Sequence, residues 1–348
     1  MTENILQVKG LQVWYDTREG PLNAVNDVSF SLKKEERFGL VGESGSGKTT
    51  LATALMRLIK PPGQIKGGEV LLEGKDLLKL SDEEMRQTRA TEISMIPQGA
   101  MNSLNPVMRI QDQMIDTLRD HGVSKTRSEF RKWATELLER VGLTGEVASM
   151  YAHELSGGMK QRIAIATGIS LRPKVIIADE PTSALDVVVQ REVMGTLRLA
   201  QQDLGAAVIL IGHDMGLMAQ FADRIGVMYA GKLIEVASVR DIFKNPQHPY
   251  TQLLIASLPS LEEKAVFRGI PGRTPSLLNP PSGCGFHPRC PKAMDHCSRL
   301  VPALREVATG QSVSCHLYDE TTGFTGSVRP NGNGESEIVG PSSAAPQH

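Results

Sequence analysis

Cysteine is absent from the first 283 residues of this 348-residue chain, and aromatic residues make up only 4%. So few aromatic residues argue against a surface that stacks on single-stranded nucleic acid. The charges nearly cancel, with 38 Lys and Arg against 39 Asp and Glu, which argues against a strongly basic nucleic-acid-binding protein. No uninterrupted apolar run reaches the about 18 residues of a membrane-spanning helix. The start, MTENILQVKG, lacks the basic and apolar segments of a secretory signal, so we expect neither a membrane span nor secretion.

Periodic patterns near the N-terminus predict strands followed by a helix. Segments 6–13 and 28–32 alternate apolar and polar residues, which is typical of strands with one buried face. Residues from Leu51 have helical spacing, and we expect the proline pair at 61–62 to stop that helix.

Continuous apolar runs at 175–178 and 207–211, with helices between them, predict strands of a parallel sheet that is covered on both faces. Between about 101 and 171 the pattern is mostly helical, with Ser124 placed to cap one helix. We therefore expect an α/β domain over 1–232 that carries a helical subdomain.

The composition changes past Gly231. Proline becomes frequent and all four cysteines follow, which indicates a small irregular region over 233–318. Residues 319–348 contain too few apolar side chains to bury, so we expect a disordered tail there.

The sequence GESGSGKTT matches the phosphate-loop pattern G-x-x-x-x-G-K-[ST], and it lies between a predicted strand at 37–41 and a predicted helix. Glycines let successive backbone N–H groups point at phosphates, Lys48 neutralises the β- and γ-phosphates, and Thr49 can bind Mg²⁺. The alternative is an ordinary glycine-rich turn. The expected ATP-binding residues of this loop are Gly42, Glu43, Ser44, Gly45, Ser46, Gly47, Lys48, Thr49 and Thr50.

Two carboxylates end the apolar strand in VIIADE. We expect Asp179 to hold Mg²⁺ and Glu180, one residue further, to polarise the attacking water. Acidic pairs at strand ends are common, so this prediction depends on the phosphate loop.

A second anion site is predicted at LSGGMKQR, where a serine and two glycines start a helix. The simpler interpretation is a serine that only caps its own helix.

These motifs together resemble those of the ATP-binding subunits of ABC transporters. The resemblance implies a P-loop NTPase cassette with a RecA-like core and a helical subdomain. It also implies that two MgATP are sandwiched between paired subunits, with Lys48 of one subunit and the signature serine of its partner on the same γ-phosphate. The signature residues that would contact the partner's ATP are Leu155, Ser156, Gly157, Gly158 and Met159.

Other positions match the family in order. By this resemblance Tyr15 stacks on adenine, Gln98 contacts Mg²⁺, and His213 contacts the γ-phosphate, so that Glu180, His213 and Lys48 are the catalytic residues. The alternative for the adenine-stacking role is that Tyr15, or its neighbour Trp14, is simply a core residue. The alternative for His213 is a structural histidine. The loop expected to touch the other subunit is formed by Ser183, Ala184, Leu185 and Asp186.

Residues 248–259 and the cysteine segment after them resemble the C-terminal extension of the oligopeptide/dipeptide (and nickel) import branch. The resemblance implies a peripheral ATPase at the cytoplasmic face of the membrane. Its implied partners are a paralogous ATPase subunit, two membrane permease subunits and an extracytoplasmic solute-binding protein, with no nucleic acid. The alternatives are a soluble ABC-type ATPase acting on nucleic acid or ribosomes, and a non-catalytic regulatory cassette, which the presence of Glu180 and His213 disfavours.

The cysteines are separated by five, six and seventeen residues, which matches neither a zinc ribbon nor a bacterial ferredoxin. In the branch that this chain resembles, four such cysteines are associated with a [4Fe–4S] cluster, and the implied ligands are Cys284, Cys290, Cys297 and Cys315. A zinc site that includes His287, His296 or His316, and inert thiols, stay open as alternatives.

Overall fold

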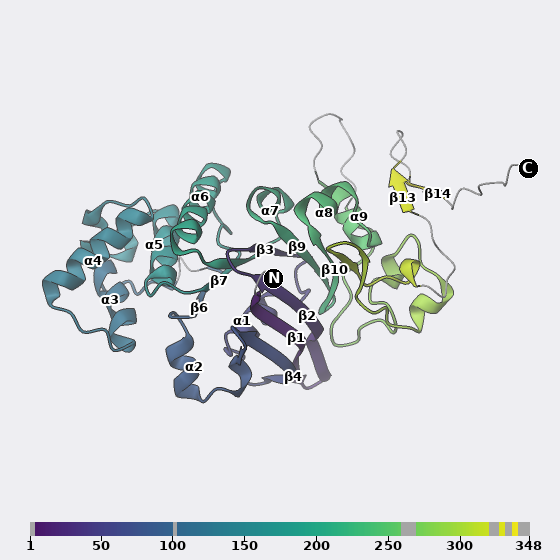
Figure 1. Ribbon diagram of the computed structural model, residues 1–348, viewed down its shortest axis with the longest axis horizontal. Helices are drawn as coiled ribbons and strands as arrows, with labels where there is room; N and C mark the ends of the chain where they lie inside the picture. Colours follow the sequence, from purple (N-terminus) through teal and green to yellow (C-terminus); the bar gives the residue numbers. More distant parts are fainter. Residues whose placement is uncertain (1–3, 100–102, 259–268, 320–326, 331–335, 340–348) are drawn as a thin grey trace, which may run out of the picture.

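The computed structural model describes residues 4–99, 103–258, 269–319, 327–330 and 336–339. An eight-stranded sheet forms its centre (Figure 1). The strands of this sheet are β3 (Arg37–Val41), β6 (Ile93–Ile96), β7 (Val175–Asp179), β8 (Ala207–Ile211), β9 (Arg224–Tyr229), β10 (Lys232–Ser238), β11 (Arg305–Ala308) and β12 (Gln311–Val313). Their order is β11-β12-β10-β9-β3-β8-β7-β6. The strands from β9 to β6 are parallel, and β10, β12 and β11 continue the sheet with antiparallel pairing.

A second, antiparallel sheet carries the N-terminal residues. Its strands are β1 (Asn4–Thr17), β2 (Gly20–Lys33), β4 (Gly63–Leu72) and β5 (Lys75–Asp76), in the order β2-β1-β4-β5. The strands predicted at 6–13 and 28–32 are confirmed as parts of β1 and β2. Both strands are longer than predicted because the pairing between them continues beyond these segments.

The helices gather at the ends and faces of the central sheet. They are α1 (Lys48–Leu55), α2 (Asp82–Thr88), α3 (Ile110–Asp120), α4 (Arg127–Arg140), α5 (Gly157–Ile169), α6 (Val187–Leu204), α7 (Met215–Phe221), α8 (Val239–Lys244) and α9 (Pro249–Ala256). In Figure 1 the helices α3, α4 and α5 lie at one end of the molecule, opposite the C-terminal region. They occupy the segment of the predicted helical subdomain.

The two faces of the central sheet bury separate cores, which explains the continuous apolar runs. Along β8, Val208 and Leu210 pack with residues of α5 and α6, whereas Ile209 and Ile211 pack with residues of β1, β2 and α1. Side chains of a strand alternate between its faces, so a strand that is covered on both sides must be apolar throughout. The prediction of parallel strands with two covered faces is confirmed.

Two helix boundaries differ from their predictions. The cap of α4 is Thr126 rather than Ser124: the Thr126 hydroxyl accepts from the backbone of Glu129, whose carboxylate accepts from the backbone of Thr126. This reciprocal pair satisfies two of the free N–H groups at the helix start. The helix after the phosphate loop already ends at Leu55, because Arg57 has a φ of 48° and left-handed backbone does not continue an α-helix.

The central sheet continues across the predicted domain division at residue 232. Strand β10 begins there and pairs with both β9 and β12. The division of the chain into an α/β domain over 1–232 and a C-terminal region over 233–318 therefore stays a prediction. The predicted tail lies mostly outside the described residues, within which β13 (Ser327–Pro330) pairs with β14 (Ser336–Val339). No helix in the described ranges is long and apolar enough to span a membrane.

Candidate functional site

The loop from β3 to α1 follows a path that only glycine permits at two positions. A Cβ on Gly42 would lie 2.2 Å from the Met228 carbonyl oxygen, and a Cβ on Gly47 would lie 2.1 Å from the Ala24 carbonyl oxygen. Both glycines also have positive φ, 152° and 99°. The neighbouring strands β2 and β9 thus require the glycines of the motif, and the loop leads directly into the N-terminus of α1.

Lys48 begins α1, and its side chain turns back over the loop. Its ammonium group donates to the carbonyl oxygens of Gly42 and Glu43 at 2.8 and 2.9 Å and to the Ser46 hydroxyl at 3.3 Å. Burial lowers the pKa of Lys48, while the nearby carboxylates of Glu180 and Asp179 act to raise it. The remaining motif residues lie with it: Ser44 and Gly45 are exposed in the loop, and Thr49 and Thr50 are in the first turn of α1.

Asp179 is the last residue of β7 and is fully buried. Neither carboxylate oxygen has a partner within ordinary hydrogen-bond geometry among the described residues. Burial raises the pKa of Asp179, the charge of Glu180 raises it further, and the Thr49 hydroxyl and Lys48 act in the opposite direction. A buried carboxylate without a partner is costly unless a cation or a donor joins it. Asp179 and Thr49 therefore fit the predicted Mg²⁺ site.

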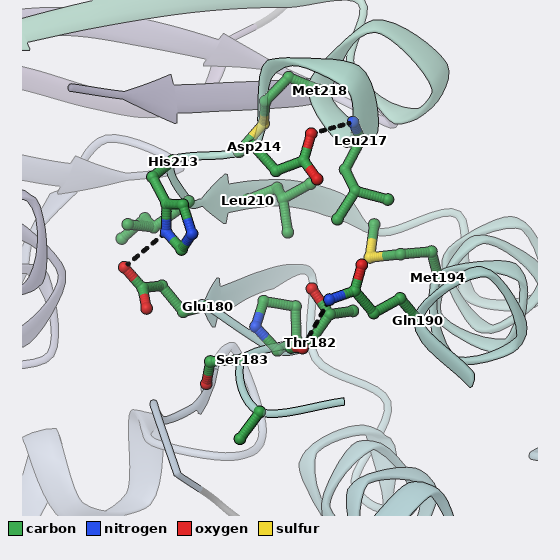
Figure 2. A pocket seen from close by; sticks show the side chains of 14 residues that line it. Glu180, Thr182, Ser183, Gln190, Met194, Leu210, His213, Asp214, Leu217 and Met218 are labelled. Atoms are coloured by element: carbon green, nitrogen blue, oxygen red, sulfur yellow. Dashed lines mark hydrogen bonds and ion pairs between the residues drawn. The ribbon is translucent and has the colours of Figure 1, made fainter. Parts of the chain in front are cut away.

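Glu180 leaves the end of β7 in left-handed backbone, with a φ of 45°. The Gln98 amide donates to its Oε2 at 2.7 Å, and the Nδ1 atom of His213 lies 3.5 Å from its Oε1. Figure 2 shows His213 and Glu180 facing each other from the ends of β8 and β7. The structure thus brings together Gln98, Glu180 and His213 from three segments of the chain. Left-handed backbone is unfavourable for a glutamate and is often found where function fixes a side chain.

A small cavity extends from Glu180 and His213 toward α6 and α7 (Figure 2). Its volume of about 170 Å³ is below the roughly 300–1,000 Å³ of typical ligand pockets, so it does not hold a nucleotide by itself. Ser183 and Ala184 of the predicted dimer loop line it, and Ala184 has a φ of 64°. Asp186 caps α6, because its Oδ1 accepts from the backbone of Val188 and Val189. Leu185, the remaining residue of this loop, is partly buried.

The signature residues form the start of α5. Ser156 is exposed and caps the helix, its hydroxyl accepting from the backbone N–H of Met159 at 3.3 Å, which confirms the predicted helix start. A Cβ on Gly158 would lie 2.6 Å from a methyl group of Val189 in α6, so this glycine allows two helices to approach closely. Leu155 is buried in the core, and Gly157 is partly exposed.

Tyr15 lies near the end of β1 and is partly buried. A Cβ on Gly63 would lie 2.6 Å from its ring, so the ring rests against the first residue of β4. The contacts among the described residues do not distinguish a Tyr15 ring that stacks on adenine from one that only packs in the core. The adenine-stacking role of Tyr15 therefore stays a prediction.

Glu43 has partners that the motif does not indicate. Arg289 donates to its carboxylate from both terminal nitrogens, at 2.8 and 3.0 Å, and the Thr274 hydroxyl donates at 2.7 Å. The backbone N–H of Glu43 donates to the Tyr250 hydroxyl at 3.0 Å. Burial acts to raise the pKa of Glu43, but Arg289 and Thr274 hold it below its usual value. These partners are more than about 200 positions away in the sequence, and no local spacing signals such contacts.

The arrangement of the cysteine segment gives no support to the predicted metal site. Among the described residues, which include Cys284, Cys290, Cys297 and Cys315, no group of three or more His, Cys, Asp or Glu is arranged to hold a metal ion. Burial raises the pKa of Cys315 to about 12.

Within the described residues, the histidines beside the cysteines also belong to no group of three or more His, Cys, Asp or Glu arranged to hold a metal ion. The ring nitrogens of His316 lie 2.6 Å from an Asp319 carboxylate oxygen and 2.9 Å from the Leu300 carbonyl oxygen. Nδ1 of His287 lies 2.9 Å from the Cys284 carbonyl oxygen. The geometry therefore supports neither the [4Fe–4S] cluster nor the zinc alternative.

Comparison with known proteins agrees with the site. The profile described as ABC transporter matches residues 25–183, and the profile described as oligopeptide/dipeptide transporter, C-terminal region, matches residues 234–297. The dipeptide transport ATP-binding protein DppD of Caldanaerobacter subterraneus subsp. tengcongensis is 43% identical over 318 residues, 91% of this chain and 98% of that protein. The oligopeptide transport ATP-binding protein OppD of Escherichia coli is 42% identical over 314 residues, 89% of this chain and 92% of that protein.

Among solved structures, a similar one is the dimeric structure of MJ0796, a bacterial ABC transporter cassette. It is 28% identical, with a TM-score of 0.61 over 68% of this chain and 99% of that chain. The sequence similarity extends through both the cassette and the cysteine segment. The chain therefore belongs to the ABC transporter family, with the C-terminal region of the oligopeptide/dipeptide transporters.

Proposed function

We propose that this chain is the ATP-hydrolysing subunit of a membrane ABC importer of peptides or related solutes. The observation that carries the proposal is the meeting of Lys48, Glu180 and His213 at the carboxyl ends of β3, β7 and β8. Because β3, β8 and β7 are adjacent and parallel, these ends share one edge of the sheet. Ligands of such sheets bind at that edge.

In the proposed reaction Glu180 accepts a proton from the water that attacks the γ-phosphate in line. Gln98 and His213 hold the Glu180 carboxylate from two sides, which fixes its direction before substrate binds. Lys48 and the backbone N–H groups of the loop stabilise the phosphate charge. Thr49, Asp179 and Gln98 are the residues that would hold Mg²⁺, which when bound neutralises charge on the β- and γ-phosphates.

Ser156 and its helix N-terminus serve, in this proposal, the ATP held by a second ATPase subunit. The exposure of Ser156 supports this role, because it leaves the hydroxyl accessible to another chain. A further similar solved structure, 27% identical with a TM-score of 0.61, is a dimeric post-hydrolysis state of the same cassette bound to ADP and Pi. We propose a paralogous subunit as the partner and Ser183–Asp186 as the loop that touches it.

The proposed remaining partners are two membrane permease subunits and an extracytoplasmic solute-binding protein. The names of the relatives refer to dipeptide and oligopeptide transport, which supports peptides as the solute class. The chain would then work peripherally at the cytoplasmic face, with the surface around Gln98 facing the permeases.

Affinity purification of the tagged chain from native membranes, followed by mass spectrometry, tests this proposal. We expect two permease subunits and a second ATPase in the same complex, with ATP hydrolysis that Lys48→Ala abolishes. Recovery with ribosomes or nucleic acid and without a membrane protein would instead support the soluble ABC-type ATPase.

The cluster on Cys284, Cys290, Cys297 and Cys315 stays a proposal that rests on the resemblance alone. Anaerobic purification should give a brown protein with iron and acid-labile sulfide. Stoichiometric zinc without sulfide, or no metal, would overturn the cluster and leave the ATPase proposal intact.

A further inference from the structure

The ion pair between Glu43 and Arg289 joins the phosphate loop to the cysteine segment. Its geometry is bidentate, with two nitrogens of one guanidinium facing two oxygens of one carboxylate. The Arg289 side chain is only 5% exposed and that of Glu43 is 22% exposed, so water screens the pair weakly. Bidentate pairs of this kind fix position as well as charge.

Arg289 is itself held in place by several groups. Its Nε donates to the Pro271 carbonyl oxygen at 2.8 Å, and its Nη1 donates to the Tyr229 hydroxyl at 3.2 Å. Its backbone lies in a short 3₁₀ turn, His287–Arg289. The backbone N–H of Cys290 donates to the His287 carbonyl oxygen, and the backbone N–H of His287 donates to the Cys284 carbonyl oxygen. The position of the guanidinium therefore depends on the fold of the cysteine segment.

An aromatic cluster attaches this segment to the cassette. Tyr229 of β9, Tyr250 of α9 and Phe286 contact one another with ring centroids 4.7 to 5.4 Å apart, and all three are buried. The Tyr250 hydroxyl accepts from the backbone N–H of Glu43. The loop is thus held at one residue through both its backbone and its side chain.

Glu43 carries a negative charge within a loop that must bind a polyphosphate. Without a counter-charge, the Glu43 carboxylate would repel the phosphates and compete for Lys48, whose ammonium already contacts the Glu43 carbonyl oxygen. The guanidinium of Arg289 removes this conflict, and its rigid attachment keeps the loop in one conformation.

We propose that Arg289 is a positioning residue for ATP binding, through which the folded cysteine segment sets the affinity of the phosphate loop for MgATP. The inference rests on the proposed nucleotide site. It assigns to the C-terminal region a role in nucleotide affinity that does not require a metal. Arg289 acts through Glu43 and does not itself need to contact ATP.

Isothermal titration of MgATP into the full-length chain and its variants tests this role, with a thermal melt of each variant. We expect Arg289→Ala to weaken MgATP binding about tenfold, within the range of typical coupling between sites. In the double variant Glu43→Gln/Arg289→Ala the stranded charge is gone, so affinity should return to within about threefold of the wild type. The matched control is Arg37→Ala, because Arg37 also makes a bidentate contact with a carboxylate, that of Asp223, at the opposite end of β3. It should bind MgATP like the wild type.

The inference fails if Arg289→Ala binds MgATP as tightly as Arg37→Ala, or if Glu43→Gln brings no recovery. If Arg289→Ala gives no cooperative melt, Arg289→Lys, which keeps the charge but loses the second contact, should show a smaller loss that Glu43→Gln does not improve. A wild-type chain that does not bind MgATP, or a Lys48→Ala variant that binds equally well, would contradict the proposed function instead.

Discussion

Helices α1 and α5 both begin with small residues suited to phosphate, yet their surroundings differ. The start of α1 has Lys48 buried over its loop, with the carboxylates of Asp179 and Glu180 close enough to affect its pKa. The start of α5 has an exposed Ser156 whose hydroxyl caps its own helix. One helix start is therefore surrounded by a buried cation and two carboxylates, and the other presents a hydroxyl, N–H groups and the helix dipole.

Under the proposed function, this difference explains how one chain serves two phosphate sites with one set of catalytic groups. In the proposed mechanism the α1 site supplies the groups for hydrolysis, and the α5 site holds a γ-phosphate delivered by another subunit. If that division is correct, substitutions at the two helix starts should have separable effects.

The largest effect is expected from Glu180→Gln. Gln98 can still contact the new amide, so MgATP binding should stay near the wild-type level, but the base that activates water is lost. We expect phosphate release by the assembled complex to fall by about 10²–10⁴-fold.

The control for this change is Glu73→Gln, which removes the charge of an exposed glutamate that pairs with Lys174. Its rate of phosphate release should match the wild type. Undiminished hydrolysis by Glu180→Gln would show that Glu180 is not the base. It would also contradict the assignment of the hydrolytic groups to the start of α1.

A smaller effect is expected at the signature glycine that packs against α6. In Gly158→Ala the added methyl would meet a Val189 methyl group at 2.6 Å, so Val189 must change its rotamer or α5 and α6 must move apart. We expect the free energy of unfolding to fall by about 1–2 kcal/mol, measured by urea denaturation.

Gly195→Ala is the matched control on α6, since no atom other than those of its chain neighbours and its own helix backbone lies within 4 Å of the position of its new Cβ. This variant should gain about 0.5–1 kcal/mol, because alanine favours a helix interior over glycine. Equal stability of the two variants would show that Gly158 is not required by packing.

The parts of the site that follow from local backbone chemistry are predictable from the sequence. The strand, glycine loop and helix around Lys48, and the cap at Ser156, are confirmed in the structure because a few adjacent residues determine each of them. The cap at Thr126 carries a local signal of the same kind, a glutamate three residues later, so the choice of Ser124 was an error of interpretation.

Contacts between distant segments are not predictable in this way. Arg289 and Glu43 are separated by 246 positions, and neither residue belongs to a pattern that names the other. The spacing of the cysteines likewise does not determine whether their sulfur atoms converge. Both the contact between Arg289 and Glu43 and the distances between the cysteine sulfur atoms depend on the tertiary fold, which determines the segments that pack together.

The measurement that tests the division between the two helix starts most directly is MgATP binding to the isolated chain. Lys48→Ala removes the cation of the α1 site. Ser156→Asp keeps a good helix cap at α5 but adds a negative charge where a phosphate would lie. The account predicts that Lys48→Ala loses measurable binding, while Ser156→Asp binds with wild-type affinity yet supports no turnover in the assembled complex. Equal weakening of binding by both variants in the isolated chain would contradict it, because both helix starts would then serve one nucleotide.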